Sequence, residues 1–218
     1  IVTQTQCEVC AVSPKDLDRA VRDWTGSKPR IISLTPNSMA DVWTDIRNVA
    51  DSLNATDRGD QLVAQLQARM TTIKQKAEQL DKQPSVGCLE WIDPLMAAGN
   101  WMPELVKMAG GENIFGEAGQ HSPWMTWESL LNEDPEVILI LPCGYRIVDS
   151  RRNIPVLTRK ADWPSLRAVK TNRVFIADGN QYFNRPGPRL AESLELLAEI
   201  LHPELFGVSY EGIGWERL

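Results

Sequence analysis

The feature that most constrains this chain is the alternation of short, wholly apolar stretches with longer amphipathic ones. Uninterrupted apolar runs are typical of strands buried on both faces, whereas apolar spacings of three and four residues predict helices. We expect strands at residues 1–6, 30–34, 86–91, 137–141 and 173–177. Strands that alternate with helices form parallel sheets that are covered on both faces. The sequence therefore predicts an α/β fold.

The longest helical stretch covers residues 57–82, where apolar residues recur every three to four positions and no proline interrupts. A helix of some 25 residues would be close to ~40 Å long. Its heptads are too few and too irregular for a coiled coil. We interpret it as a helix that connects two lobes: residues 1–56 as the remnant of an amino-terminal α/β lobe, and residues 83–218 as a complete carboxyl-terminal α/β lobe.

Local signals set several helix boundaries. Pro36-Asn37-Ser38 opens a helix, Thr126 caps a short one, and Gly110-Gly111 stops the helix over residues 101–109. The last amphipathic helix covers residues 188–201, with leucines at helical spacing.

Charge and hydropathy limit the partners. The 218 residues carry a net charge of −6, which speaks against nucleic acid or anionic lipid as the main partner because phosphate binding needs a basic face. No apolar run approaches the roughly 20 residues of a membrane-spanning helix. The chain opens on Ile1, inside a predicted strand and without an initiator Met. We expect that it continues a longer sequence upstream.

Aromatic residues gather in the segments that follow predicted strands, in a chain with eight Trp but only three Tyr and four Phe. Ligands of such folds bind beyond the carboxyl ends of the strands. Aromatic rings there would offer a flat apolar wall for a large planar ligand. Anchoring of the loops is an equally open role for any single Trp. The residues expected to line the ligand are Trp91, Trp101, Trp124, Tyr145, Tyr182 and Phe183.

Catalysis has little support in the sequence. The two histidines, His121 and His202, have no Ser or Cys partner at motif spacing, and no dinucleotide-binding, phosphate-binding, nucleophile-elbow or zinc-protease motif occurs. We predict a binding protein rather than an enzyme.

Three interpretations of the cysteines stay open. They can pack as small apolar residues, Cys7 and Cys10 can form a disulfide, or Cys7, Cys10 and Cys143 can act as thiolate ligands of a soft metal at the strand ends. A redox enzyme that uses Cys7 and Cys10 is a further alternative.

Three segments carry a family resemblance: residues 86–116 (VGCLEWIDPLMAAGNWMPELVKMAGGENIFG), 122–137 (SPWMTWESLLNEDPEV) and 179–190 (GNQYFNRPGPRL). Together with the opening IVTQTQCEVCAVS, they resemble the substrate-binding proteins of ABC transporters for cobalamin and iron-siderophores, and most of all the cobalamin-binding ones. The resemblance implies two Rossmann-like lobes joined by one long helix, with the ligand held between the lobes. Family members have another segment before the first strand seen here, so it also implies that the first lobe is incomplete.

The resemblance further implies a periplasmic or lipid-anchored extracytoplasmic protein that delivers a small molecule to a membrane permease and meets the membrane only through it. The ligand would be cobalamin or a related metal chelate, with no cofactor held by the protein itself. Trp124 falls near the aromatic residue that packs on the corrin. Glu128 falls on a glutamate that docks on permease arginines, although an acid at a helix start also complements the helix dipole.

In the same family, Tyr182, Phe183 and Arg185 occupy the loop that closes under the ligand. Two roles stay open for Arg185: contact with a ligand carboxylate or amide, and bonding of the loop through carbonyl groups. An iron-siderophore or haem is the second expectation for the ligand. It ranks below cobalamin because anionic chelates favour cationic side chains, and this wall offers few cations beyond Arg185 and Arg146. Capture of a bare metal ion through the cysteines is the third.

Overall fold

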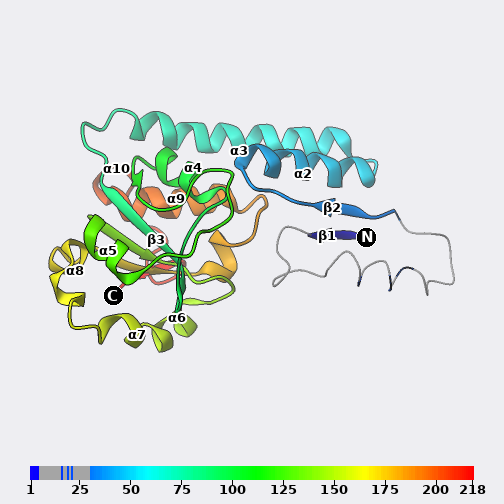
Figure 1. The fold of residues 1–218 in the computed structure, drawn as a ribbon. Helices are drawn as coiled ribbons and strands as arrows, with labels where there is room; N and C mark the ends of the chain where they lie inside the picture. The colour runs from blue at the N-terminus through cyan, green and yellow to red at the C-terminus, as the bar shows by residue number, and fades with distance from the viewer. Residues whose placement is uncertain (5–15, 17–18, 20, 22–29) are drawn as a thin grey trace. The chain divides into compact units, whose positions relative to one another are not determined.

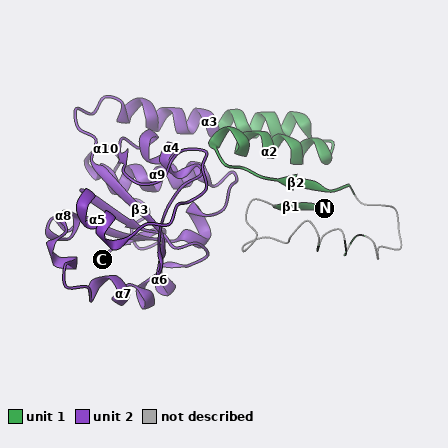
Figure 2. Cartoon of the chain, in the orientation of Figure 1, with its two compact units in different colours: residues 1–65 green, residues 66–218 purple. Residues whose placement is uncertain are grey.

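The computed structural model describes residues 1–4, 16, 19, 21 and 30–218 (Figure 1). These residues form two compact units, residues 1–65 and residues 66–218, and the boundary falls inside helix α3 (Figure 2). The part of the predicted first strand after residue 4 lies outside the described residues.

The first unit contains a two-stranded parallel sheet and, among elements whose bounds the structure describes, helix α2 and the start of α3. Strand β1 (Val2–Gln4) pairs with β2 (Ile32–Leu34), with Thr3 opposite Ser33. Helix α2 (Met39–Ser52) begins with a capping box, in which Ser38 Oγ accepts a hydrogen bond from Asp41 N (3.2 Å) and Asp41 accepts one from Ser38 N (2.9 Å). The predicted helix start at Ser38 is therefore confirmed.

Helix α3 (Thr56–Ala77) is the longest helix described, with 22 residues. The sequence predicts a helix to residue 82, but α3 ends at Ala77. The amides of Gln79 and Leu80 bond the carbonyls three residues earlier (3.2 and 3.1 Å), which tightens the chain into a turn.

The second unit is built on one mixed sheet with the strand order β4-β3-β6-β7-β8. The three central strands are parallel, with Leu89 opposite Ile140 and Ile140 opposite Ile176. They coincide with three predicted strands, which confirms the α/β class. The central strands are β3 (Ser85–Ile92), β6 (Val137–Ile140) and β7 (Val174–Ala177).

The strands at both edges of this sheet are antiparallel to their neighbours, which corrects the expectation of a wholly parallel sheet. Strand β4 (Leu95–Ala97) pairs antiparallel with β3, and β8 (Trp215–Arg217) pairs antiparallel with β7. Each has only three residues, and β8 reads Trp-Glu-Arg, so neither forms an apolar run that sequence patterning detects. A two-residue strand, β5 (Glu112–Asn113), pairs in parallel with the start of β3.

Helices cover both faces of the sheet (Figure 1). On one face, side chains of the central strands share a core cluster with Leu130, Leu157 and Trp163 from the segment that contains α5, α7 and α8. On the other face, Gly111 lies tightly against Val86 of β3 and against residues of α4 and α9. The helices are α4 (Met102–Met108), α5 (Trp127–Glu133), α6 (Ile147–Asn153), α7 (Pro155–Thr158), α8 (Arg167–Lys170), α9 (Leu190–Leu201) and α10 (Pro203–Phe206).

Two predicted helix boundaries are confirmed in this unit. Thr126 caps α5, because its Oγ1 accepts a hydrogen bond from Ser129 N (3.1 Å). Gly110 follows α4 with a φ of +82°, a backbone conformation in which glycine avoids steric strain. Within the described residues, no helix combines the length and the apolar composition that a membrane span requires.

Candidate functional site

The carboxyl ends of β3, β6 and β7 meet at one edge of the sheet, and open α/β sheets bind their ligands beyond this edge. Trp91 near the end of β3 stands opposite Met96 of β4, and Met96 forms an isolated bridge with Trp124. Side chains of directly opposite residues share one face of a sheet. Trp91, Met96 and Trp124 therefore form a row on the same face.

Tyr145, which follows β6, extends this row. Its ring meets that of Trp91 edge-on, with 5.3 Å between ring centroids. We call Trp91, Met96, Trp124 and Tyr145 the aromatic row. Trp124 is 66% exposed, and the other three side chains are half-buried. An exposed indole of this size at a strand-end edge is a surface suited to a flat apolar ligand.

Sequence reasoning named three members of the aromatic row but missed Met96. The signal that could have found Met96 was its place in strand β4, but this strand is too short for its apolar pattern to be detected in the sequence. A thioether beside aromatic rings is a soft, adaptable contact.

The loop after β7 packs against the base of the row. Its first residues, Gly179–Phe183, form a π-helical turn that Asp178 caps by accepting a hydrogen bond from Gln181 N (2.7 Å). Asn180 N donates to the carbonyl of Tyr145 (3.0 Å). Arg185 is exposed and donates from Nε to the Asn180 carbonyl (2.8 Å) and from Nη2 to Asn180 Oδ1 (2.7 Å). Two roles were left open for Arg185. The structure shows the one in which Arg185 holds the loop by hydrogen bonds to Asn180.

Other residues expected at the ligand lie beneath this surface. Phe183 is fully buried, and Trp101 is 5% exposed and donates from Nε1 to the Phe183 carbonyl (3.0 Å). Tyr182 is buried against Tyr210 and under the guanidinium of Arg189. Direct ligand contact does not fit the burial of Trp101 and Phe183, whose rings support the loop from below.

One carboxylate, Glu90, lies next to the aromatic row and is half-buried. Its Oε2 accepts a hydrogen bond from Ser122 Oγ (2.8 Å), and Ser122 Oγ accepts one from Gly99 N (3.0 Å). Burial raises the pKa of the Glu90 carboxyl above its ordinary value, and the hydrogen bond from Ser122 and the nearby His121 oppose that shift. Glu90 therefore ties the segment before Trp124 to β3.

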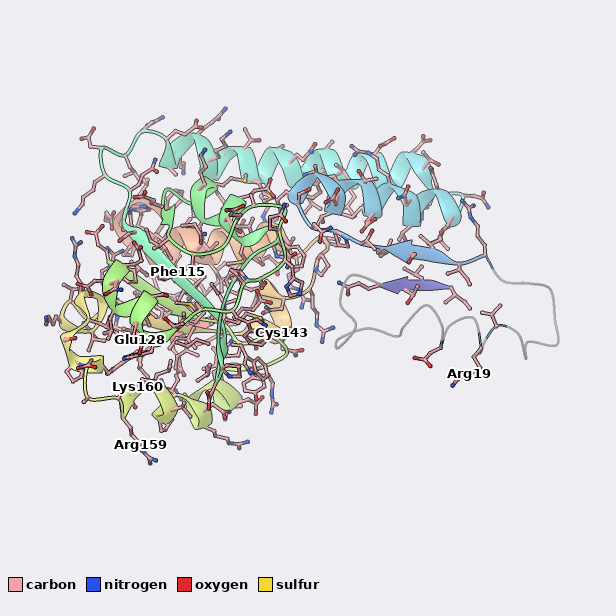
Figure 3. All side chains as sticks on the ribbon, in the orientation of Figure 1. Arg19, Phe115, Glu128, Cys143, Arg159 and Lys160 are labelled. Carbon is pink, nitrogen blue, oxygen red and sulfur yellow. The ribbon has the colours of Figure 1, made fainter. Side chains whose placement is uncertain are left out.

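The cysteines divide between the described and undescribed parts of the chain. Cys7 and Cys10 lie outside the described residues, so their proposed disulfide or metal role stays a prediction. Cys143 is half-buried after β6, and its amide donates to the Glu90 carbonyl (3.0 Å) (Figure 3). Cys88 is buried in β3, where burial raises the pKa of its thiol to about 12. Among described residues, no three His, Cys, Asp or Glu side chains form a metal-binding group.

The predicted docking residue, Glu128, lies in the first turn of α5 and is exposed (Figure 3). Its neighbour Trp127 stacks on Trp163 with 6.3 Å between centroids, and Lys160 Nζ lies 5.0 Å from the Trp127 ring. Glu128 thus stands on a helix whose neighbouring residue, Trp127, is held by a stacked ring and a cation.

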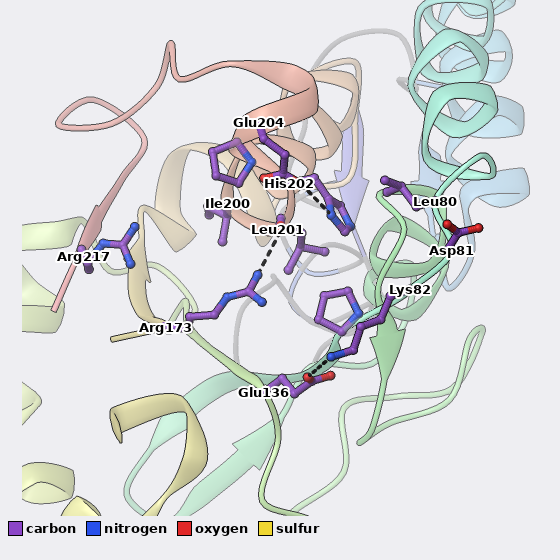
Figure 4. Close-up of a pocket in the computed structure, with 12 residues that line it drawn as sticks. Leu80, Asp81, Lys82, Glu136, Arg173, Ile200, Leu201, His202, Glu204 and Arg217 are labelled. Carbon is purple, nitrogen blue, oxygen red and sulfur yellow. Dashed lines mark hydrogen bonds and ion pairs between the residues drawn. The ribbon is translucent and has the colours of Figure 1, made fainter. Parts of the chain in front are cut away.

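A hollow of about 600 Å³ lies at the opposite edge of the sheet, near the amino ends of the central strands (Figure 4). Charged side chains in and around it form hydrogen bonds with one another and with the backbone. Glu136 accepts hydrogen bonds from Lys82 (3.0 Å) and Arg167 (2.6 Å), and Arg173 donates to the Leu201 carbonyl (2.9 Å). Contacts of this kind close helix ends and strand connections, so the aromatic row is the stronger candidate for a ligand site.

Comparison with known proteins agrees with this geometry. The family model of the periplasmic binding proteins matches residues 21–180. The substrate-binding lipoprotein YvrC of Bacillus subtilis, an uncharacterized ABC transporter protein, is 24% identical over 176 residues, which cover 78% of this chain and 52% of YvrC. The haem uptake protein IsdE of Staphylococcus aureus (strain MRSA252) is 28% identical over 142 residues, 64% of this chain and 49% of IsdE. The chain thus spans about half the length of these curated relatives.

Solved structures show the same fold. S. aureus IsdE in complex with haem superposes with a TM-score of 0.70 at 22% identity, covering 80% of this chain and 69% of IsdE. The periplasmic haem-binding protein RhuT from Roseiflexus sp. RS-1 gives a TM-score of 0.72 at 23% identity, covering 92% of this chain and 74% of RhuT. Because the family model spans most of the sequence and the fold agrees with it, this chain belongs to the periplasmic binding protein family.

Proposed function

We propose that this chain is part of the extracytoplasmic binding component of an ABC importer, which captures a solute and delivers it to a membrane permease. Membership of the periplasmic binding protein family and the transporter names of its relatives support this role. The function is binding rather than catalysis. The observation that carries the proposal is the aromatic row, an exposed apolar surface at the carboxyl edge of the sheet.

The proposed ligand is a large planar metal chelate, with haem ahead of the corrinoid that the sequence resemblance implied. Two of the similar proteins described above are named for haem. The aromatic row fits the flat apolar face of either macrocycle. A corrinoid stays the second candidate and an iron-siderophore the third.

The charges around the row bear on this choice. Arg146 pairs with Asp149 (2.9 Å), so it offers less to an anion than the sequence suggested. Arg185 uses contacts at Nε and Nη2 to hold Asn180, but a guanidinium carries five N–H donors. Its exposed edge is the group that would meet a carboxylate of an anionic chelate such as haem.

Location and docking belong to the same proposal. A periplasmic or lipid-anchored position fits the family, since the B. subtilis relative is named as a lipoprotein. Glu128 would dock on a basic residue of the permease, because it is exposed in the first turn of α5. The charge reversal Glu128→Lys should then abolish transport of the ligand through the permease without changing the affinity of the chain for the ligand.

The decisive measurement is a titration of the purified chain with haemin, cyanocobalamin and a ferric hydroxamate chelate in parallel. We expect haemin to quench intrinsic Trp fluorescence in a saturable, stoichiometric way, with a shifted haem absorption band. Saturation by cyanocobalamin alone would restore the corrinoid assignment. Absence of saturable binding by all three would reject a chelate ligand for this chain.

A variant pair locates the ligand on the row. Trp124→Ala should weaken haemin binding about 10- to 100-fold, the effect of removing an aromatic anchor. Ile213→Ala is the matched control, because Ile213 is also 66% exposed but lies in the segment before β8. Equal affinities of the two variants would place the ligand elsewhere, while leaving the carrier function intact.

A further inference from the structure

The net charge of the chain conceals a strong segregation of charge. The chain carries −6 overall, yet residues 146–173 contain eight Arg and Lys with only two Asp and no Glu. This stretch includes the three consecutive short helices α6, α7 and α8. A basic segment in an acidic chain is a local electrostatic feature that whole-chain composition hides.

These helices lie together on the side of the second unit that carries the core cluster with α5 (Figure 1). The cationic side chains of α6 and α8 are exposed, and Figure 3 shows Arg159, which directly follows α7, pointing outward. Val148 of α6 and Val156 of α7 are also exposed, at 45% and 43%. Cations interspersed with exposed aliphatic side chains are typical of surfaces that rest on a membrane interface.

Neighbouring acids neutralise only part of this surface. Arg151 pairs with Glu216, Arg167 with Glu136, and Arg146 and Arg152 share Asp149. Over the described part of the chain, Arg159, Lys160 and Lys170 have no ion pair within 4.0 Å. We call Arg152, Arg159, Lys160 and Lys170, with Val148 and Val156, the basic face.

We propose that the basic face binds the surface of an anionic lipid bilayer. Its charges are spread over α6, the turn that follows α7, and α8 instead of converging on one point, which suits a flat, fluid array of phosphate headgroups. The exposed valines add an apolar contact that a bulk polyanion would not use. This contact is additional to permease docking, and it replaces the exclusion of anionic lipid that net charge alone suggested.

The test is cosedimentation of the full 218-residue chain with lipid vesicles. Vesicles of phosphatidylcholine mixed with phosphatidylglycerol should bind the chain, and vesicles of phosphatidylcholine alone should not. Binding should weaken strongly between about 0.1 M and about 1 M salt, because the screening length falls from about 10 Å to about 3 Å. Equal binding to both kinds of vesicle, or to neither, would overturn the proposal.

A pair of charge-reversal variants separates the basic face from net charge. Arg159→Glu/Lys160→Glu/Lys170→Glu should lower the vesicle partition coefficient by at least about fivefold for each residue changed. The control, Lys74→Glu/Lys76→Glu/Lys107→Glu, changes the net charge equally through exposed lysines on α3 and α4. It should lower binding far less.

Equal losses in the two variants would show a whole-chain charge effect and reject the basic face. Retention of the chain on immobilised polyglutamate without binding to the anionic vesicles would also reject lipid, in favour of an acidic protein partner. Circular dichroism melting curves confirm that each variant is folded. Because haemin is absent from the assay, its result does not depend on the proposed ligand.

Discussion

The two edges of the sheet in the second unit differ in how they use polar and charged groups. At the carboxyl edge, an exposed indole, a thioether and a phenol form a row, and the loop after β7 is held by backbone hydrogen bonds. At the amino edge, a hollow of about 600 Å³ is lined in part by charged side chains that bond one another (Figure 4). At this edge, Lys82, Glu136 and Arg173 thus already have partners. Chemistry rather than volume marks the carboxyl edge as the candidate binding edge.

Two glutamates make the contrast concrete. Glu90 lies at the carboxyl end of β3, where burial raises the pKa of its carboxyl. Glu136 lies just before β6, where burial also acts to raise its pKa, but hydrogen bonds from Lys82 and Ser85 and the charge of Arg167 outweigh burial and lower it. The amino edge stabilises its carboxylate, and the carboxyl edge tolerates one at a cost.

The largest expected effect tests how tightly the carboxyl edge is packed. A Cβ on Gly179 would stand 2.3 Å from the Pro142 carbonyl oxygen and 2.8 Å from that of Leu141. Both obstacles are backbone and cannot turn away. Gly179→Ala should therefore lower the free energy of unfolding by about 2–4 kcal/mol. Urea denaturation followed by Trp fluorescence measures the change.

Gly187 provides the matched control in the same loop. A Cβ there meets nothing within 4 Å, and its φ is not in the left-handed region. Gly187→Ala should leave stability unchanged or raise it by less than about 1 kcal/mol, since alanine restricts the unfolded chain. If both substitutions proved equally harmless, the loop after β7 would not be packed against β6 as the comparison requires.

These packing contacts explain what sequence alone predicted and what it missed. The central strands were predictable because residues 137–140 and 174–177 are wholly apolar and buried. The caps at Ser38 and Thr126 were predictable because capping is local chemistry. Strands β4 and β8 were missed because their stability comes from pairing with distant strands, which leaves no periodic trace in three residues.

The residues of the candidate site divide in the same way into those that the sequence predicts and those that it misplaces. Trp91, Trp124 and Tyr145 lie together at the carboxyl edge, where the sequence predicted aromatic residues because each of them follows a strand. Trp101 and Phe183 carry the same sequence signal, yet the structure buries them under the loop. Only the three-dimensional path of the loop after β7 separates exposed rings from buried ones, and no local pattern encodes that path.

An intermediate effect is expected at the amino edge. Glu136→Gln leaves Lys82 and Arg167 without their anion and should lower the free energy of unfolding by about 1 kcal/mol at pH 7. Because the folded pKa is lowered, the carboxylate's contribution is present above the ordinary value of 4.5 and is lost as pH falls through the folded pKa. Urea unfolding at pH 7 and pH 3 should show the difference between variant and wild type shrinking at pH 3. If the difference in stability between variant and wild type were the same at pH 7 and pH 3, the effect would come from the shape of the Glu136 side chain and not from its charge.

The smallest expected effect is of opposite sign and lies at the carboxyl edge. Because the pKa of Glu90 is raised in the folded chain, its ionisation weakens folding as pH rises above the ordinary value of 4.5. Glu90→Gln removes that cost and keeps an oxygen for the hydrogen bond from Ser122. The variant should match the wild type at pH 4 and exceed its stability by less than about 1 kcal/mol at pH 7.

Glu133→Gln, which neutralises an exposed acid on α5, controls for net charge and should show no such pH dependence. If Glu90→Gln instead destabilised the chain more at pH 7 than at pH 4, Ser122 and His121 would be stabilising the Glu90 carboxylate. The carboxyl edge would then hold its charge as the amino edge does. In that case the aromatic row, and not the treatment of buried charge, would be the remaining distinction between the two edges.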